Sequence, residues 1–257
     1  MNLIDTHCHL TFQQLSGDID AVIRRSIDAG VTGWITVGTD QEQNPKAVAL
    51  AEKFENTYAA IGIHPHDART VTDEDLENLK VLAENKKVVA IGETGLDFHY
   101  NFSTPEEQRR VFIEHLKIAE QLKLPVVIHS REAFDETINI LDEFAKGIEK
   151  IVFHCFPGSD EQAKMILDRG WFVSFTGVVT FKNAHIVRKA VEAVPIERLM
   201  LETDCPYMSP EPMRKQKINE PSLMVHTASF IANLKHIELE NFAEIAAKTS
   251  KDFFNII

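Results

Sequence analysis

The sequence has no long apolar run, few cysteines and no excess of basic residues. Among its 257 residues, no apolar stretch reaches the roughly 20 residues that a membrane-spanning helix needs. The three cysteines are too few for a disulfide framework, which fits a reducing compartment. The chain enters a predicted strand without a basic leader. We therefore expect a cytoplasmic protein with no membrane partner, and no stable protein partner can be inferred from the sequence.

The missing positive charge limits the kinds of partner. Lys and Arg number 27 against 39 Asp and Glu, so the net charge is −12. This balance disfavours a protein that grips many phosphates through a broad basic surface. It still permits a protein that holds one or two phosphates through metal ions and a few local arginines.

No low-complexity segment or linker divides the chain. Instead, a short apolar strand followed by an amphipathic helix recurs at the spacing of an eight-fold βα barrel. The predicted strands are 2–7, 33–37, 58–63, 88–91, 125–129, 151–154, 171–174 and 199–202. A doubly wound open sheet shares this alternation, but its Gly-rich phosphate turn is missing after the first strand. We therefore predict one α/β domain over residues 1–257, a (β/α)8 TIM barrel.

Polar residues follow the predicted strands at the point where each strand ends. Because the carboxyl ends of the strands form one rim of a (β/α)8 barrel, these side chains are expected to converge on one mouth. A histidine after a buried strand is often only a structural hydrogen-bonding group, but so many at strand ends indicate a metal site. The residues at these ends are His7, His9, His64, Glu93, His129, His154 and Asp204.

The donor types favour two cations around an open centre. A structural zinc site is closed and usually includes cysteine, whereas these residues offer imidazole nitrogen and carboxylate oxygen. We predict that His7, His9 and Asp204 hold one divalent cation, that His129 and His154 hold the other, and that Glu93 bridges the two. Zinc, magnesium and manganese all suit such ligands. Two such ions can generate a hydroxide at neutral pH and clamp the oxygens of a phosphoryl displacement.

The candidate residues stand in short motifs distributed along nearly the whole chain. The motifs are Asp5-Thr6-His7-Cys8-His9-Leu10, Gly62-Ile63-His64-Pro65, Gly92-Glu93-Thr94-Gly95-Leu96-Asp97, His129-Ser130-Arg131, His154-Cys155-Phe156-Pro157-Gly158, Glu202-Thr203-Asp204-Cys205-Pro206-Tyr207 and Asn219-Glu220-Pro221. Taken together, these motifs resemble the TatD-type metal-dependent deoxyribonucleases, within the amidohydrolase-like (β/α)8 metallohydrolases, and their combination is highly specific. The resemblance implies the ligand set inferred above, with Glu93 at the place of a carbamylated lysine in more distant relatives.

The remaining motif residues have alternative roles. The fork of Arg131 is a candidate phosphate clamp, or one half of a surface ion pair. His64 is expected to orient substrate or move a proton. Together with Glu93 and Asp204, it is a candidate catalytic residue. Asn219 is a candidate substrate contact, or a residue that starts the next helix. Asp97 and Glu202 either fix histidine tautomers or make structural hydrogen bonds, and the basic cluster Arg214, Lys215 and Lys217 either is solvated or meets a nucleic-acid backbone.

The leading hypothesis is a nuclease that cleaves DNA phosphodiesters from a single-stranded end by a metal-activated hydroxide. The alternative is a dimetal amidohydrolase, esterase or deacylase acting on a small acyl substrate or a charged RNA, because the same metal chemistry serves carbonyl and phosphoryl centres. A non-catalytic metal-dependent binding module is disfavoured by the complete ligand set.

Overall fold

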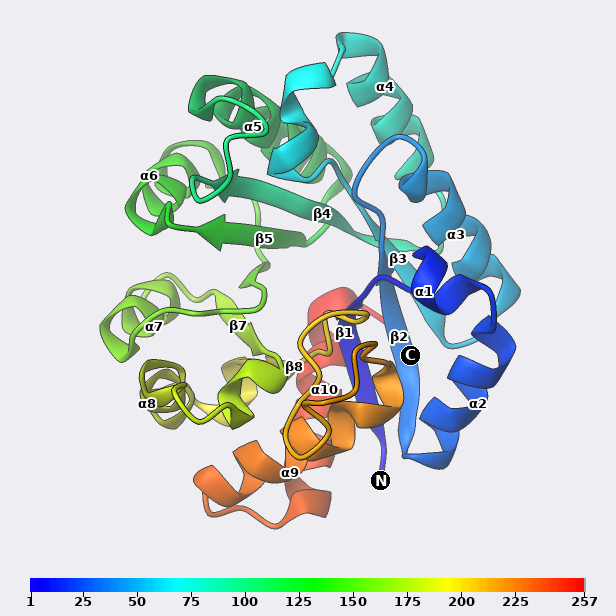
Figure 1. Ribbon diagram of the computed structural model, residues 1–257. Coiled ribbons are helices and arrows are strands. Elements are labelled where there is room, and N and C mark those ends of the chain that lie inside the picture. Colours follow the sequence, from blue (N-terminus) through cyan, green and yellow to red (C-terminus); the bar gives the residue numbers. More distant parts are fainter. Residues whose placement is uncertain (257) are drawn as a thin grey trace. The chain divides into compact units, whose positions relative to one another are not determined.

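The computed structural model describes residues 1–256, in which strands and helices alternate along the chain (Figure 1). The strands are β1 (Leu3–Cys8), β2 (Val31–Val37), β3 (Thr57–Ile61), β4 (Val88–Asp97), β5 (Val126–Arg131), β6 (Ile151–Phe153), β7 (Phe172–Phe175) and β8 (Leu199–Leu201). Their order in the sheet is the order of the chain, which is the order of the predicted barrel.

The helices occupy the segments between the strands and after β8. The α-helices are α1 (Gln13–Ser16), α2 (Ile19–Asp28), α3 (Gln43–Lys53), α4 (Asp73–Leu82), α5 (Pro105–Leu122), α6 (Phe134–Phe144), α7 (Asp160–Leu167), α8 (His185–Ala193), α9 (Met224–Leu234) and α10 (Leu239–Phe254). The short 3-10 helices are η1 (Pro65–Thr70), η2 (Gly177–Thr180), η3 (Ile196–Arg198) and η4 (Pro221–Leu223). No described helix combines the length and the apolar character that crossing a bilayer requires.

The chain divides into two compact units, and the first consists of residues 1–36 together with residues from 155 onward. In this unit β1 pairs in parallel with β2, and β7 pairs in parallel with β8. Helix α10 packs against β1 and β8. It does so through an apolar face that includes Phe253 and Phe254, whose side chains are almost fully buried. Burying two such aromatic side chains contributes several kcal/mol.

The second unit comprises residues 37–154 and is built around β4. Strand β4 pairs in parallel with β3 and β5, and β5 pairs with β6. Helix α5 packs on β4 (Figure 1). It begins with a capping box, in which the Thr104 hydroxyl accepts from the Glu107 amide at 3.3 Å and the Glu107 carboxylate accepts from the Thr104 amide at 2.7 Å. Val111, Phe112 and Leu116 then form its buried face.

Strand β4 is longer than the sequence predicts. The predicted strand ends at residue 91. That boundary is wrong: pairing with β5 resumes after an irregularity between Ile91 and Thr94, and continues to Asp97. Glu93 therefore lies inside the strand and not after it.

Gly95 is where the two strands leave no room for a side chain. Its φ is +141°, and a Cβ atom there would lie 2.0 Å from the carbonyl oxygen of His129. Gly95→Ala is expected to lower the free energy of unfolding by at least about 2 kcal/mol, since both the backbone and the contact are incompatible with alanine. Denaturant unfolding measures the loss. Gly17→Ala is the control, because nothing lies within 4 Å of its position; an equal effect of both changes would contradict the explanation.

Candidate metal centre

The first group of candidate ligands lies in the first unit, at the end of β1 and after β8. His7 belongs to β1, His9 follows its end, and Asp204 follows the end of β8. Two backbone hydrogen bonds join the segments: the Asp204 amide donates to the His7 carbonyl, and the His9 amide donates to the Cys205 carbonyl, each at 2.9 Å. The backbone therefore brings together side chains that are almost 200 residues apart in the sequence.

Buried polar side chains hold this junction in place. The backbone amide and the hydroxyl of Thr203 both donate to the buried carboxylate of Asp5, at 2.9 and 2.6 Å. The Asn219 side-chain amide donates to the carbonyls of Thr203 and Tyr207, at 3.1 and 2.7 Å, and its oxygen accepts from the Glu220 amide. Asn219 is fully buried. These contacts favour the structural alternative for Asn219 over direct contact with substrate.

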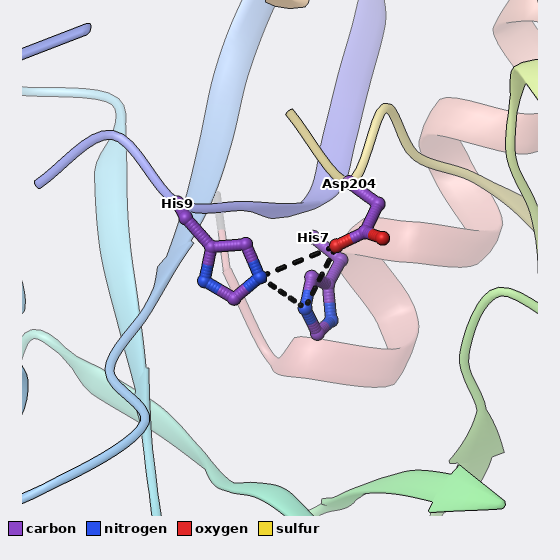
Figure 2. A group of neighbouring side chains, drawn as sticks. All are labelled: His7, His9 and Asp204. Atoms are coloured by element: carbon purple, nitrogen blue, oxygen red, sulfur yellow. Dashed lines mark hydrogen bonds and ion pairs between the residues drawn. The ribbon is translucent and has the colours of Figure 1, made fainter. Parts of the chain in front are cut away.

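The three donor atoms of this group suit a cation. His7 Nε2 lies 3.3 Å from His9 Nε2, and Asp204 Oδ1 lies 3.2 Å from His9 Nε2 and 3.7 Å from His7 Nε2 (Figure 2). Ligand atoms about 2.1 Å from a tetrahedral cation are about 3.4 Å apart, so the spacing fits. A neutral imidazole has only one N–H, and two Nε2 atoms aimed at each other and at a carboxylate are better satisfied by a shared cation.

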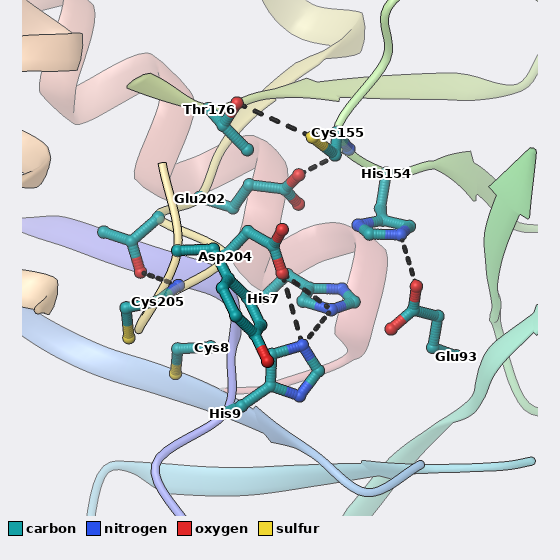
Figure 3. Close-up of polar contacts among 12 residues, drawn as sticks. His7, Cys8, His9, Glu93, His154, Cys155, Thr176, Glu202, Asp204 and Cys205 are labelled. Carbon is teal, nitrogen blue, oxygen red and sulfur yellow. Dashed lines mark hydrogen bonds and ion pairs between the residues drawn. The ribbon is translucent and has the colours of Figure 1, made fainter. Parts of the chain in front are cut away.

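The second group lies in the second unit around one carboxylate oxygen. Glu93 Oε1 is 2.7 Å from His129 Nδ1 and 2.8 Å from His154 Nε2. Figure 3 shows the contact between His154 and Glu93. His64 Nε2 lies 3.4 Å from the same oxygen. Burial alone would raise the pKa of Glu93, but His154 and His64 facing it hold the pKa well below its usual range. Glu93 is therefore an anion at neutral pH, ready to bind a cation.

His64 presents an N–H to this group. Its Nδ1 accepts a hydrogen bond from the backbone amide of His66 at 3.2 Å, so Nε2 carries the proton of the neutral ring. Burial lowers the pKa of His64 to about 4, which keeps the ring neutral near pH 7. An N–H at Nε2 cannot ligate a metal, but it can donate a hydrogen bond. The geometry thus fits the orienting role that the sequence predicts for His64.

His129 is held between two carboxylates. While Nδ1 faces Glu93, Nε2 lies 3.0 Å from Asp97 Oδ2, which is also 3.0 Å from His66 Nε2. Burial alone would lower the pKa of His129, but the hydrogen bonds to Asp97 and Glu93 raise it. When Nε2 donates to Asp97, the lone pair of Nδ1 is left for a cation. Of the two roles considered for Asp97, the structure therefore supports fixing a histidine tautomer.

Asp97→Asn is expected to weaken metal binding by the second group about 10- to 100-fold, because a neutral amide cannot hold two histidines in this way. Calorimetric titration of metal-free protein with Zn²⁺ or Mn²⁺ measures the change. Asp28→Asn changes the same type of side chain at an exposed position of α2 and is the matched control. Equal affinities in the two variants would show that Asp97 does not orient His129 for a metal.

Glu202 makes structural contacts in the first unit. Its two carboxylate oxygens accept from the Cys155 amide at 2.5 Å (Figure 3) and from the Ser174 hydroxyl at 2.6 Å. Cys155 has a positive φ of 44°, and its sulfur lies 3.6 Å from the Thr176 hydroxyl. Glu202 thus ties the segment after β6 to β7 and β8.

The basic residues singled out from the sequence lie against aromatic rings or are exposed to solvent. The Arg131 guanidinium lies 4.9 Å from the centre of the Tyr100 ring, and among residues 1–256 it forms no ion pair. The Arg214 guanidinium lies over the Phe181 ring at 3.8 Å. Lys215 and Lys217 are exposed in the same loop. The surface ion pair considered for Arg131 is not formed.

Sequence reasoning missed two features of this region. His66 shares Asp97 with His129, and exposed aromatic side chains at Tyr100 and Phe102 lie beside His66. The signal for His66 was its place two residues after His64, in the His-Pro-His stretch. The aromatic residues had no comparable signal, because an isolated Tyr or Phe in a loop is common.

The chain is similar to known proteins over nearly its whole length. The TatD related DNase family matches residues 4–255. The uncharacterized metal-dependent hydrolase YabD of Bacillus subtilis is 40% identical over 256 residues, which cover 99% of each chain. A 3'-5' ssDNA/RNA exonuclease TatD of Cronobacter sakazakii is 38% identical over 90% of this chain and 89% of its own.

A solved structure gives the same result for the fold. The crystal structure of YJJV, a TatD homologue from Escherichia coli K12, matches with a TM-score of 0.93 and 32% identity, over 99% of this chain and 98% of that one. The predicted (β/α)8 TIM-barrel class is thereby confirmed. The chain belongs to the TatD related DNase family and is a metal-dependent hydrolase.

Proposed function

We propose that this chain is a metal-dependent nuclease that removes nucleotides from an exposed single-stranded end of DNA. The observation that supports this most directly is the convergence of His129 and His154 on one oxygen of Glu93. Membership of the TatD related DNase family and the exonuclease name of the relative from Cronobacter sakazakii support the choice of substrate.

Each donor group is proposed to hold one divalent cation, either zinc, magnesium or manganese. His7, His9 and Asp204 form the first ligand set, and Glu93, His129 and His154 form the second. Imidazole nitrogens favour zinc, whereas carboxylate oxygens also suit magnesium and manganese. When bound, such cations neutralise phosphate charge and lower the pKa of water. The sequence also predicts that Glu93 contacts both cations, and this stays a prediction.

The side chains around the donors have separate roles in this proposal. Glu93 and Asp204 supply the anionic charge that balances the cations. His64, neutral and protonated at Nε2, donates a hydrogen bond to a phosphate oxygen and so orients the scissile group. The exposed guanidinium of Arg131 binds a neighbouring phosphate through its planar fork. The sequence predicts that Asn219 contacts the substrate. Its side-chain amide is already engaged in buried hydrogen bonds, which does not favour this role.

A second candidate function is hydrolysis of a small acyl substrate or deacylation of a charged RNA. The acidic net charge of −12 favours it, because a nuclease with a wide basic groove would carry the opposite charge. The two functions differ in product: the nuclease releases nucleotides, and the acyl hydrolase releases an acid.

We propose that residues 1–257 work as one domain in the cytoplasm, as the sequence predicts. The three cysteines form no disulfide among the described residues, which suits a reducing compartment.

The test uses protein loaded with metal, end-labelled single- and double-stranded DNA, and a panel of esters, lactones and amides. We expect stepwise release of nucleotides from the single strand, loss of that activity in chelator, and recovery when metal is added back. Intact DNA together with rapid turnover of an ester or amide would reject the nuclease in favour of the acyl hydrolase. Undiminished turnover in chelator would reject the metal dependence.

A further inference from the structure

Two aromatic side chains project from the loop between β4 and α5. Tyr100 is 40% exposed and Phe102 is 57% exposed, whereas most large apolar side chains of this chain are buried. Their rings are stacked on each other, with centroids 5.4 Å apart and an interplanar angle of 26°. Exposed aromatic rings leave apolar surface in contact with water and add nothing to the core. Their position therefore indicates a role outside folding.

A positively charged side chain, Arg131, lies beside these two rings, and the three residues together form a surface patch. The guanidinium of Arg131, at the end of β5, lies over the Tyr100 ring at 4.9 Å. Arg131 is exposed and pairs with no carboxylate in the described chain, although the protein is acidic overall. The nearby Glu132 is engaged with His99, 2.6 Å away. The patch therefore combines flat apolar surface with a guanidinium that is still available to an anion.

The patch adjoins the second donor group. The His66 ring contacts Tyr100 and Phe102, with centroid separations of 5.3 and 4.9 Å. His66 also shares Asp97 with His129, whose other nitrogen faces Glu93. One histidine ring thus separates the aromatic pair from the residues that surround the Glu93 carboxylate.

We propose that Tyr100 and Phe102 form a stacking platform for an unpaired nucleobase of the substrate, with Arg131 binding the phosphate of that nucleotide. This inference rests on the proposed nuclease function. A single-stranded nucleic acid fits the patch because each of its nucleotides offers a flat π-face, the base, and a negative charge, the phosphate. Every base can stack on an aromatic ring. A base that is paired within a duplex has both faces covered, so the platform selects single strands.

The test variant is Phe102→Ala, with Phe102→Trp as the conservative rescue and Ile186→Ala as the control. Ile186 is 60% exposed on α8 and belongs to neither donor group. Each protein is assayed with a single-stranded oligonucleotide and with the same oligonucleotide carrying abasic residues at its last three positions. Three quantities are measured: the KM and the kcat of the metal-loaded enzyme, and the Kd of the fluorescently labelled strand in chelator.

We expect Phe102→Ala to raise the KM and the Kd for the normal strand about 5- to 150-fold, the range for losing one stacked base, with kcat changed less than about 2-fold. The abasic strand should bind wild type and Phe102→Ala equally weakly. Phe102→Trp and Ile186→Ala should keep the wild-type values. A KM and a Kd that are unchanged in Phe102→Ala, or that rise equally for both strands, would overturn the platform.

The outcome also separates the platform from the nuclease itself. If wild type does not cleave the strand but binds it in a way that depends on Phe102 and on the bases, the platform stands and the proposed catalytic function fails. If wild type cleaves both strands equally well, the function stands and the platform fails. If wild type neither binds nor cleaves, both are rejected.

Discussion

Glu93→Ala is expected to lower turnover of single-stranded DNA at least about 100-fold, equivalent to about 2.7 kcal/mol of lost transition-state stabilisation. The carboxylate of Glu93 is 3% exposed and lies between the nitrogens of His129 and His154. Its removal takes away the anion on which these imidazoles converge, so a cation there would lose its charge balance. Initial rates of nucleotide release with saturating metal and substrate measure the effect.

Glu143→Ala removes the same functional group from an exposed position of α6 and is the matched control. It should keep wild-type turnover. Circular dichroism and thermal unfolding establish that Glu93→Ala is folded, which we expect because the strand pairing of β4 does not involve the side chain. Near wild-type turnover in a folded Glu93→Ala protein would show that the second donor group is not part of the catalytic centre.

A linear single strand is expected to be degraded at least about 100-fold faster than a closed circular single strand of the same sequence. The donor atoms are themselves buried: His9 is 4% exposed and Asp204 8%. A phosphodiester must therefore approach closely, and a free end with chain on one side only does so more easily than a continuous backbone. A difference of this size corresponds to about 2.7 kcal/mol between the two transition states.

Gel electrophoresis of the two labelled substrates over time measures these rates. Mononucleotides should appear from the linear strand before any shortened intermediate disappears. Linearising the circle with a restriction oligonucleotide and its nuclease is the control, since the cut product should then be degraded at the linear rate. Rapid nicking of the closed circle would contradict end-directed cleavage.

The positions of the candidate ligands were predictable because they follow from strand topology. Parallel strands that alternate with helices end on the same side, so a histidine or carboxylate at each end is brought toward its neighbours. The alternation of side chains along a strand was sufficient to predict that His7 and His9 point the same way near the end of β1. The place of Asp204 directly after the last strand was sufficient to predict that it lies near them. In each case the local pattern and the fold give the same answer.

The length of β4 was not predictable in the same way. Gly92, Glu93 and Gly95 are typical of a turn when read alone, and only pairing with β5 keeps the backbone extended. The strand could be recognised only once the neighbouring strand and the close approach of Gly95 to His129 were known.

Hydrogen bonds that fix the histidine rings were also beyond the sequence. The proton of His64 is placed by the backbone amide of His66, and Asp97 is shared between His66 and His129. Both depend on loop conformation and side-chain rotamers, which no periodicity encodes. The same holds for Arg131, whose contact with Tyr100 joins a strand end to a loop.

Elemental analysis of purified protein decides whether the two donor groups each hold a divalent cation. Wild type, His9→Ala and His154→Ala are dialysed against saturating Zn²⁺ or Mn²⁺, separated from free ions, and their metal content is compared with protein concentration. We expect close to two ions per chain in wild type and close to one in each variant. Absence of bound metal in wild type, or two ions retained in both variants, would contradict it.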